Sequence, residues 1–314
     1  MSEQQHLFRC VLAIIIASFL WGTTGTAASF APDVSPLAIG AVATGGGGFL
    51  MLLKSSGPLL RQRGLLFSQY KYVFWGGLSV AVYPLAFYSS MRLAGVAIGT
   101  VISIASAPCF AVLMERFING RPVTAKWMLS FLLGFAGILC LVMAKPHADT
   151  AVAGDQREWG ILLGLLAGLT YAAYSWTGKT MIVNGVRSDV AMAVQFGVAS
   201  CLLLPSLFFT GDNLLASSGN ITVALYMALI PMFGGYLLFG YGLQKIDASI
   251  ATLITLLEPV VATLLAVWML SERFSLTGWM GIGLIAGCIA VQMIKGGRKA
   301  KRRRHAEVLQ SDPQ

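Results

Sequence analysis

The chain contains ten long apolar segments, separated by charged residues or by Gly, Pro and Asn. Each segment has roughly the 20 mostly apolar residues that a helix needs to cross a bilayer. Only 11% of all residues are charged, against about 25% in a soluble domain, so the chain lacks the polar surface of a water-soluble enzyme. The segments predict an all-α integral membrane protein with ten transmembrane helices: Cys10–Phe30, Pro36–Leu53, Val73–Leu93, Val96–Ile118, Trp127–Ala144, Trp159–Thr177, Val190–Thr210, Ile221–Leu243, Ser249–Leu270 and Thr277–Ile294.

Basic residues are divided unevenly between the two sets of loops. With the N-terminus in the cytoplasm, 18 of the 22 Lys and Arg residues fall on the cytoplasmic side. Only Arg92, Lys145, Arg157 and Arg273 fall on the other side. This bias is the positive-inside signal, so we expect the N- and C-termini to be cytoplasmic. We interpret the basic residues 295–314 as a cytoplasmic tail beside anionic lipid, and expect no nucleic-acid partner.

The sequence offers no clustered ligands for a cofactor or a metal and no catalytic nucleophile motif at membrane depth. The five Cys residues all lie in apolar segments without a Cys-x-x-Cys pair, and the three His residues lie outside the segments. A metal site needs such side chains as clustered ligands. The chain also lacks a complete Walker phosphate loop and a Gly-x-Ser-x-Gly nucleophile motif. We therefore expect no enzyme, no catalytic residues, no metal and no cofactor.

An internal repeat relates the two halves of the chain. The segment Val96–Met143 aligns with Asp247–Ile294 at an offset of 151 residues, so that Pro108 falls on Pro259. Each half has five segments, and because five is odd the second half enters the membrane from the opposite side. The sequence therefore predicts two inverted five-helix repeats, 10–144 and 159–294. Inverted repeats around a site at the membrane midplane are typical of secondary transporters.

Three short motifs carry a resemblance to a known family. They are Phe19–Gly22, Leu257–Val260 and Ser271–Phe274, and together they resemble the drug/metabolite transporter superfamily, in particular its EamA-type ten-helix transporters. The first half departs from the pattern, because Ala107–Cys109 lacks the acid and Gly120–Pro122 replaces Gly-Glu-Arg. The resemblance implies a multi-pass exporter or permease of the bacterial inner (plasma) membrane.

Glu258 is the most informative single residue. It is the tenth residue of the 22-residue segment Ser249–Leu270 and the only ionisable side chain between Asp247 and Glu272. A charge at that depth costs roughly 2.5–3.5 kcal/mol. Two interpretations remain open. Glu258 is either a proton or cationic-substrate site, or a carboxyl that caps backbone donors near Pro259, whose ring bends the helix.

Aromatic residues with polar tips lie near the middle of several segments. The resemblance places their helices around a central cavity, although Tyr and Trp also mark membrane interfaces. An aromatic, hydroxyl-rich cavity suits amphipathic solutes such as amino acids or aromatic metabolites. The substrate-binding candidates are Trp21, Thr24, Tyr83, Tyr171, Tyr236, Thr255 and Glu258.

Together these features favour a secondary-active transporter that exports a small metabolite or amino acid in exchange for protons, with a small-molecule substrate and the lipid bilayer as its partners. A membrane enzyme would need a second acid or a nucleophile beside Glu258. A scaffold or sensor would need a soluble domain, whereas no loop exceeds about 20 residues. The substrate, the direction, the coupling ion and the choice between monomer and homodimer stay open.

The ten-segment topology predicts where labels will react. Single cysteines placed near the two termini should be modified by a membrane-impermeant reagent from the same side of the membrane, because an even number of crossings returns the chain to its starting side. Labelling of the two termini from opposite sides would contradict the ten-helix prediction.

Overall fold

The computed structural model describes residues 3–144, 154–270 and 275–294, and every regular element in these ranges is a helix. The motif segment Ser271–Phe274 and the basic tail from residue 295 lie outside the described residues. The helices of the first half are α1 (Glu3–Gly22), α2 (Thr24–Ala28), α3 (Pro36–Arg61), α4 (Arg63–Ser68), α5 (Tyr70–Ala94), α6 (Val96–Phe117) and α7 (Ala125–Met143).

The second half repeats the order of long helices, but two of its crossings are irregular. One crossing, Ser218–Gly242, contains a π-helical turn, and another is interrupted between α12 and α13. The helices are α8 (Gly154–Val183), α9 (Ser188–Thr210), α10 (Ser218–Met227), the π-helix η1 (Ala228–Gly234), α11 (Gly235–Gly242), α12 (Ala248–Ile254), α13 (Leu257–Leu270) and α14 (Leu276–Met293).

Nine crossings in the described residues are long and apolar enough to span a membrane. The third predicted span, Val73–Leu93, forms most of the 25-residue helix α5, but α5 is not among the nine. Its sequence carries Tyr, Trp, Ser and Gly residues that lower the mean hydropathy. Because α5 packs against α8, α9 and α6, much of its surface faces protein rather than lipid and has less need to be apolar.

Related side-chain caps start the last helix of each half. The Thr124 hydroxyl accepts a hydrogen bond from the Trp127 amide at 3.1 Å, and the Ser275 hydroxyl accepts one from the Gly278 amide at 3.3 Å. Such caps satisfy amides that have no partner in the first turn of a helix. Thr124 and Ser275 are also equivalent at the 151-residue offset, so the internal repeat includes the side-chain N-caps of these two helices.

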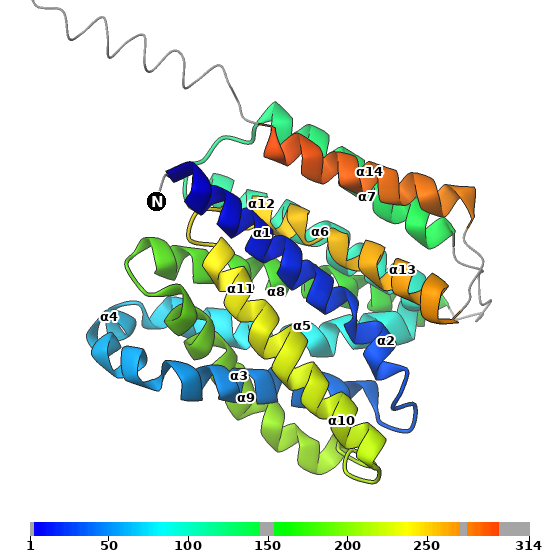
Figure 1. Cartoon of the computed structure of the whole chain (residues 1–314), viewed down its shortest axis with the longest axis horizontal. Helices are drawn as coiled ribbons and strands as arrows, with labels where there is room; N and C mark the ends of the chain where they lie inside the picture. The colour runs from blue at the N-terminus through cyan, green and yellow to red at the C-terminus, as the bar shows by residue number, and fades with distance from the viewer. Residues whose placement is uncertain (1–2, 145–153, 271–274, 295–314) are drawn as a thin grey trace, which may run out of the picture.

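The two halves interlock rather than lie side by side. The first helix of the second half, α8, packs against α5 and α6, and the first helix of the first half, α1, packs against α11 and α13. Equivalent helices also pair directly, α3 with α9 and α7 with α14 (Figure 1). Each half thus supplies the packing surface for the other, as expected for two pseudo-symmetric repeats.

Glycines allow the closest helix contacts. In the run Gly45–Gly48 of α3, a Cβ at Gly48 would lie 2.3 Å from the Phe196 carbonyl oxygen of α9, and one at Gly47 would lie 2.7 Å from Met232 Cβ of η1. Gly164 and Gly168 of α8 similarly face α5 and α6. Small residues at such positions let helix backbones approach in a membrane, which explains why α3 tolerates four consecutive glycines.

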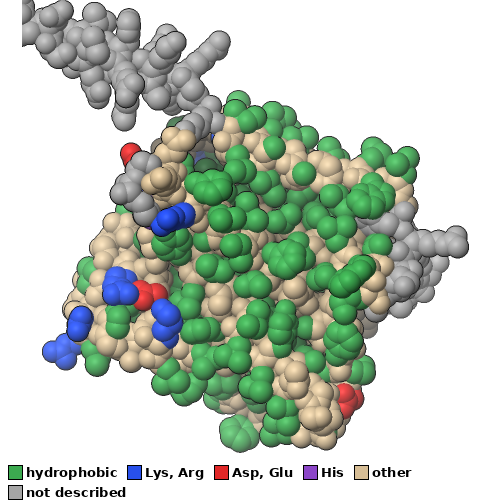
Figure 2. Space-filling view, in the orientation of Figure 1, with side chains coloured by type: hydrophobic (Ala, Val, Ile, Leu, Met, Phe, Trp, Pro, Cys, Tyr) green, Lys and Arg blue, Asp and Glu red, His purple; other side chains and the backbone are tan. Residues whose placement is uncertain are grey.

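The ends of the bundle differ in charge. Four cationic residues lie at the end where α1 begins and α14 ends, which we call the basic end: Lys54 in the last third of α3, and Arg121, Arg187 and Lys245 in connections. Figure 2 shows Lys and Arg gathered at this end, on the left, and hydrophobic side chains over the face between the two ends. This distribution is what a bundle with lipid around its middle requires.

The glycine contacts predict a large and local effect of one methyl group. Gly48→Ala should destabilise the protein by about 1–3 kcal/mol, because the added Cβ would clash with the Phe196 carbonyl group and with the Ser200 hydroxyl, both on α9. Gly57→Ala on the same helix is the control, since a Cβ there meets nothing within 4 Å, and it should change stability by less than about 1 kcal/mol. Thermal unfolding of the two purified variants in detergent tests this, and equal midpoints would contradict the packing argument.

Candidate functional site

The helix break between α12 and α13 places Glu258. Pro259 has no N–H and cannot donate to the carbonyl of Thr255 four residues earlier. The Thr255 carbonyl instead accepts a hydrogen bond from the Glu258 amide at 3.0 Å, and α13 begins at Leu257. Glu258 therefore lies in the first turn of a new helix, where the helix dipole favours a carboxylate.

An aromatic cluster lies beside this break. We use the name for Trp21, Tyr83, Tyr171, Tyr174, Phe196 and Tyr236, which come from α1, α5, α8, α9 and α11. Tyr171 stacks on Tyr174 with ring centroids 5.2 Å apart, and Tyr236 lies 4.1 Å from Phe196. Hydroxyl groups link the rings, since Tyr174 and Tyr236 share a hydrogen bond of 2.9 Å. Both halves of the chain thus contribute to one cluster.

A π-helical turn positions the Trp21 side chain. In η1 the Gly235 amide donates to the Ile230 carbonyl five residues earlier, and the Pro231 carbonyl accepts a hydrogen bond from Trp21 Nε1 at 2.9 Å. The Trp21 ring also lies 4.5 Å from Tyr236. Single π-turns inside α-helices occur frequently at functional sites, and here the turn orients a ring from the opposite half.

The side chain of Glu258 faces the interior of the bundle. Its carboxyl acts electrostatically on Tyr83 and Tyr88 of α5, Tyr171 of α8 and Tyr236 of α11. The residue is half-buried, and within the described chain no hydrogen bond or ion pair reaches its carboxyl oxygens. The interpretation as a backbone cap therefore lacks the donor it requires.

The structure brings six of the seven predicted site residues together. Trp21, Tyr83, Tyr171 and Tyr236 belong to the aromatic cluster, and the buried Thr255 accepts a hydrogen bond of 2.8 Å from the Tyr171 hydroxyl. Glu258 lies next to them. Thr24 differs, because it begins α2 and its hydroxyl donates to the Trp21 carbonyl at 2.7 Å, so it closes the end of α1.

Sequence reasoning missed two members of the cluster, Tyr174 and Phe196. Tyr174 follows Tyr171 by three residues, so the two share a helix face, and this spacing could have identified it. Phe196 carries no comparable signal in the sequence. In the part of the chain that the structure describes, His, Cys, Asp and Glu side chains form no group of three that could hold a metal ion.

A polar junction at the basic end fixes the start of α12. The buried Glu115 of α6 accepts hydrogen bonds from the Ser249 amide at 2.9 Å and the Ser249 hydroxyl at 2.6 Å. Asp247 pairs with Arg121, and the carboxylate raises the pKa of that guanidinium. Lys179 lies 3.6 Å from Asp247 and donates to the Leu243 carbonyl. The junction ties α6 and the connection after it to the helix that carries the break.

Two interlocked inverted halves, broken crossings and an acid at a helix break define the class: a multi-pass membrane protein with the architecture of a secondary transporter. The EamA-like transporter family matches residues 8–143 and 158–293. The chain belongs to this family and is a membrane transporter.

Relatives of similar length carry transporter names. The "Uncharacterized transporter YwfM" of Bacillus subtilis (strain 168) is 32% identical over 275 residues, covering 87% of this chain and 90% of that protein. The "Uncharacterized inner membrane transporter YicL" of Salmonella typhimurium is 22% identical over 301 residues, covering 93% and 97%. The "Riboflavin transporter ImpX" of Fusobacterium nucleatum is 25% identical over 156 residues, covering 49% and 52%.

A solved structure supports the fold. One protein crystal structure superposes with a TM-score of 0.74 at 20% sequence identity, over 90% of this chain and 96% of that chain. At this level of identity the likeness concerns the fold alone.

The Trp21 hydrogen bond predicts a measurable loss of stability. Trp21→Phe keeps an aromatic ring but leaves the Pro231 carbonyl without its donor, so it should lower the free energy of unfolding by about 1–3 kcal/mol. Trp75→Phe is the control, because Trp75 is 59% exposed and its only ring contact in the described residues is with Phe74. Chemical or thermal unfolding in detergent tests this, and a Trp21→Phe protein as stable as the control would show that the hydrogen bond contributes little.

Proposed function

We propose that this chain is a secondary-active transporter that moves a small amphipathic metabolite past the aromatic cluster, with Glu258 taking up and releasing the coupled proton. One observation carries the proposal. The Glu258 carboxyl acts electrostatically on tyrosines of three helices from both halves and has no hydrogen-bonding partner in the described residues. An unpaired carboxyl at membrane depth costs free energy, and this cost is consistent with a group whose protonation changes during transport.

The chemistry of the cluster supports an aromatic or amphipathic substrate. Aromatic faces bind flat apolar groups, and tyrosine hydroxyls offer hydrogen bonds to polar ones. One relative is named a riboflavin transporter, which makes riboflavin a reasonable first candidate and amino acids a second. We further propose export as the direction of transport, which secretion experiments test directly.

We also propose that the basic end faces the cytoplasm of a cell whose inner membrane holds the protein. The positive-inside bias supports this orientation, as do relatives named as inner membrane transporters. With α1 beginning and α14 ending at the basic end, both termini would then be cytoplasmic. The two halves would alternate between inward-open and outward-open arrangements by rocking around the Glu258 region.

The proposal predicts that Glu258→Gln abolishes proton-coupled transport while leaving the protein folded and inserted. Glutamine keeps the size and polarity of the side chain but removes the titrating group. Metabolites excreted by cells that overexpress wild-type protein identify the substrate. Proteoliposomes with an imposed pH gradient then measure its movement, which should fall to background in the variant.

Glu158→Gln is the matched control, because Glu158 is exposed near the start of α8, more than three helical turns before Tyr171, the first cluster residue on that helix. It should transport like wild type. Transport by Glu258→Gln protein that still follows the pH gradient would remove the proton-carrying role from Glu258. If the wild-type protein transports no metabolite, the aromatic cluster is not supported as a substrate site.

A further inference from the structure

A second potential binding site lies at the basic end, away from the aromatic cluster. It is a pocket of about 680 Å³ between α1, α3, the connection from α8 to α9, and α11. This volume is within the usual range for small-molecule sites, about 300–1,000 Å³. The polar side chains that matter for its chemistry are His6, Lys54, Arg187, Asp189, Tyr241 and Lys245.

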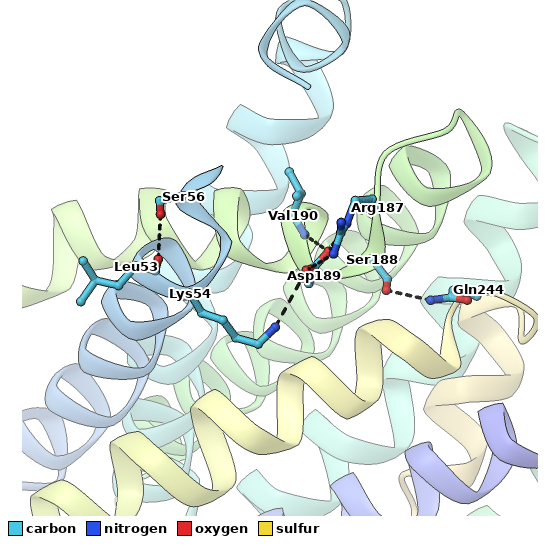
Figure 3. Close-up of polar contacts among 8 residues, drawn as sticks. All are labelled: Leu53, Lys54, Ser56, Arg187, Ser188, Asp189, Val190 and Gln244. Carbon is cyan, nitrogen blue, oxygen red and sulfur yellow. Dashed lines mark hydrogen bonds and ion pairs between the residues drawn. The ribbon is translucent and has the colours of Figure 1, made fainter. Parts of the chain in front are cut away.

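The lining of the pocket is cationic. Lys54, Arg187 and Lys245 carry positive charges and Asp189 carries the one negative charge among the lining residues. The Arg187 guanidinium binds Asp189 with two hydrogen bonds, of 3.1 and 2.9 Å, and Lys54 Nζ lies 3.9 Å from the same carboxylate (Figure 3). This carboxylate raises the pKa of Arg187, so the guanidinium stays charged.

Asp189 shows what an anionic group finds in this pocket. Besides the two cations, its carboxylate accepts a hydrogen bond of 3.0 Å from the Val190 amide in the first turn of α9. A guanidinium fork, an ammonium group and a helix N-terminus are the elements that proteins combine to bind phosphate or carboxylate. The pocket therefore has the donor set of an anion site, partly occupied by its own acid.

Asp189 does not neutralise all the positive charge in the pocket. The Lys245 ammonium has no hydrogen bond or ion pair in the described residues, and the residue is exposed. The Lys54 and Arg187 side chains are 48% and 59% exposed, so both can contact a second anion. The His6 ring lies 5.9 Å from the Tyr241 ring, and these rings give the organic part of a ligand a surface to pack on.

The wall that carries Arg187 is held in place. The Gln62 side chain donates to the Gly185 carbonyl at 3.2 Å and accepts from the Arg187 amide at 3.0 Å. On the other side the Gln244 amide group donates to the Ser188 hydroxyl at 2.9 Å (Figure 3). Fixed walls reduce the conformational entropy that binding must overcome.

We propose that this pocket binds the phosphate group of an anionic ligand, supplied either by a small phosphorylated solute or by a phospholipid headgroup. Lys245 and the exposed sides of Lys54 and Arg187 hold the phosphate, and Asp189 competes with it. The site is separate from Glu258, and its test measures binding rather than transport, so it stands or falls independently of the proposed transport function.

Inorganic pyrophosphate is the probe for the first experiment. Full-length protein in a neutral detergent should show a saturable increase in its thermal unfolding midpoint with pyrophosphate, beyond that given by sodium chloride at equal ionic strength. Lys245→Gln should weaken the apparent affinity about fivefold, the upper range for one exposed charge pair. Arg63→Gln is the control, because it removes an exposed charge near the same end but outside the pocket.

Asp189→Asn should bind pyrophosphate more tightly than wild type, a result that loss of folding could not produce. The amide can still accept the Val190 hydrogen bond but no longer neutralises the two cations, so pyrophosphate should bind about fivefold more tightly than to wild type. Stabilisation that does not saturate, an equal effect of Lys245→Gln and Arg63→Gln, or weaker binding by Asp189→Asn would each overturn the proposal.

Bilayer nanodiscs distinguish the two sources of phosphate. Phosphatidylglycerol in place of phosphatidylcholine should weaken pyrophosphate binding to wild-type protein more than to Lys245→Gln protein if a headgroup occupies the pocket. If phosphatidylglycerol changes pyrophosphate binding to wild-type and Lys245→Gln protein equally, the pocket is assigned to a soluble phosphorylated ligand. Absence of saturable pyrophosphate binding in both lipids would overturn the proposal in the bilayer.

Discussion

Backbone hydrogen bonding is the constraint on which the rest of this structure depends. Lipid supplies no partners for a free carbonyl or amide, so a break in a membrane helix must be satisfied from within the protein. The two irregular crossings meet this condition differently. At the α12–α13 break, the Thr255 carbonyl accepts the Glu258 amide. At the π-turn, the Pro231 carbonyl accepts the Trp21 indole. Both solutions place a functional candidate at the break.

Interlocking of the halves makes these two breaks neighbours. Helix α1 packs against both α11 and α13, and a Cβ at Gly22 would lie 2.8 Å from the Glu258 carbonyl oxygen. The Phe19–Gly22 motif of the first half therefore touches the Leu257–Val260 motif of the second. A rocking motion of one half against the other would change the surroundings of Trp21 and Glu258 together, as the proposed coupling of substrate and proton movement requires.

The sequence predicted the class of fold because its strongest signal is physical and local. Apolar length and the bias of Lys and Arg determine the number and direction of crossings, and Pro259 marked the broken helix. It did not predict η1, whose Pro231 carbonyl is paired with Trp21 of the other half, because such a contact joins residues distant in the sequence. Phe196 and the capping role of Glu115 were missed for the same reason, because each acts through residues distant in the sequence.

The two proposed sites have opposite charge, and this difference limits what one ligand can do in both. The pocket at the basic end is lined by three cations and one acid, whereas the acid that acts on the tyrosines of the aromatic cluster is Glu258. If a phosphate left Lys245 and moved into the low-dielectric interior, an ionised Glu258 would repel it. An organic phosphate that binds at the basic end is therefore better suited to regulate or anchor the transporter than to cross it. A substrate that crosses would be neutral, zwitterionic or cationic at the group that approaches Glu258.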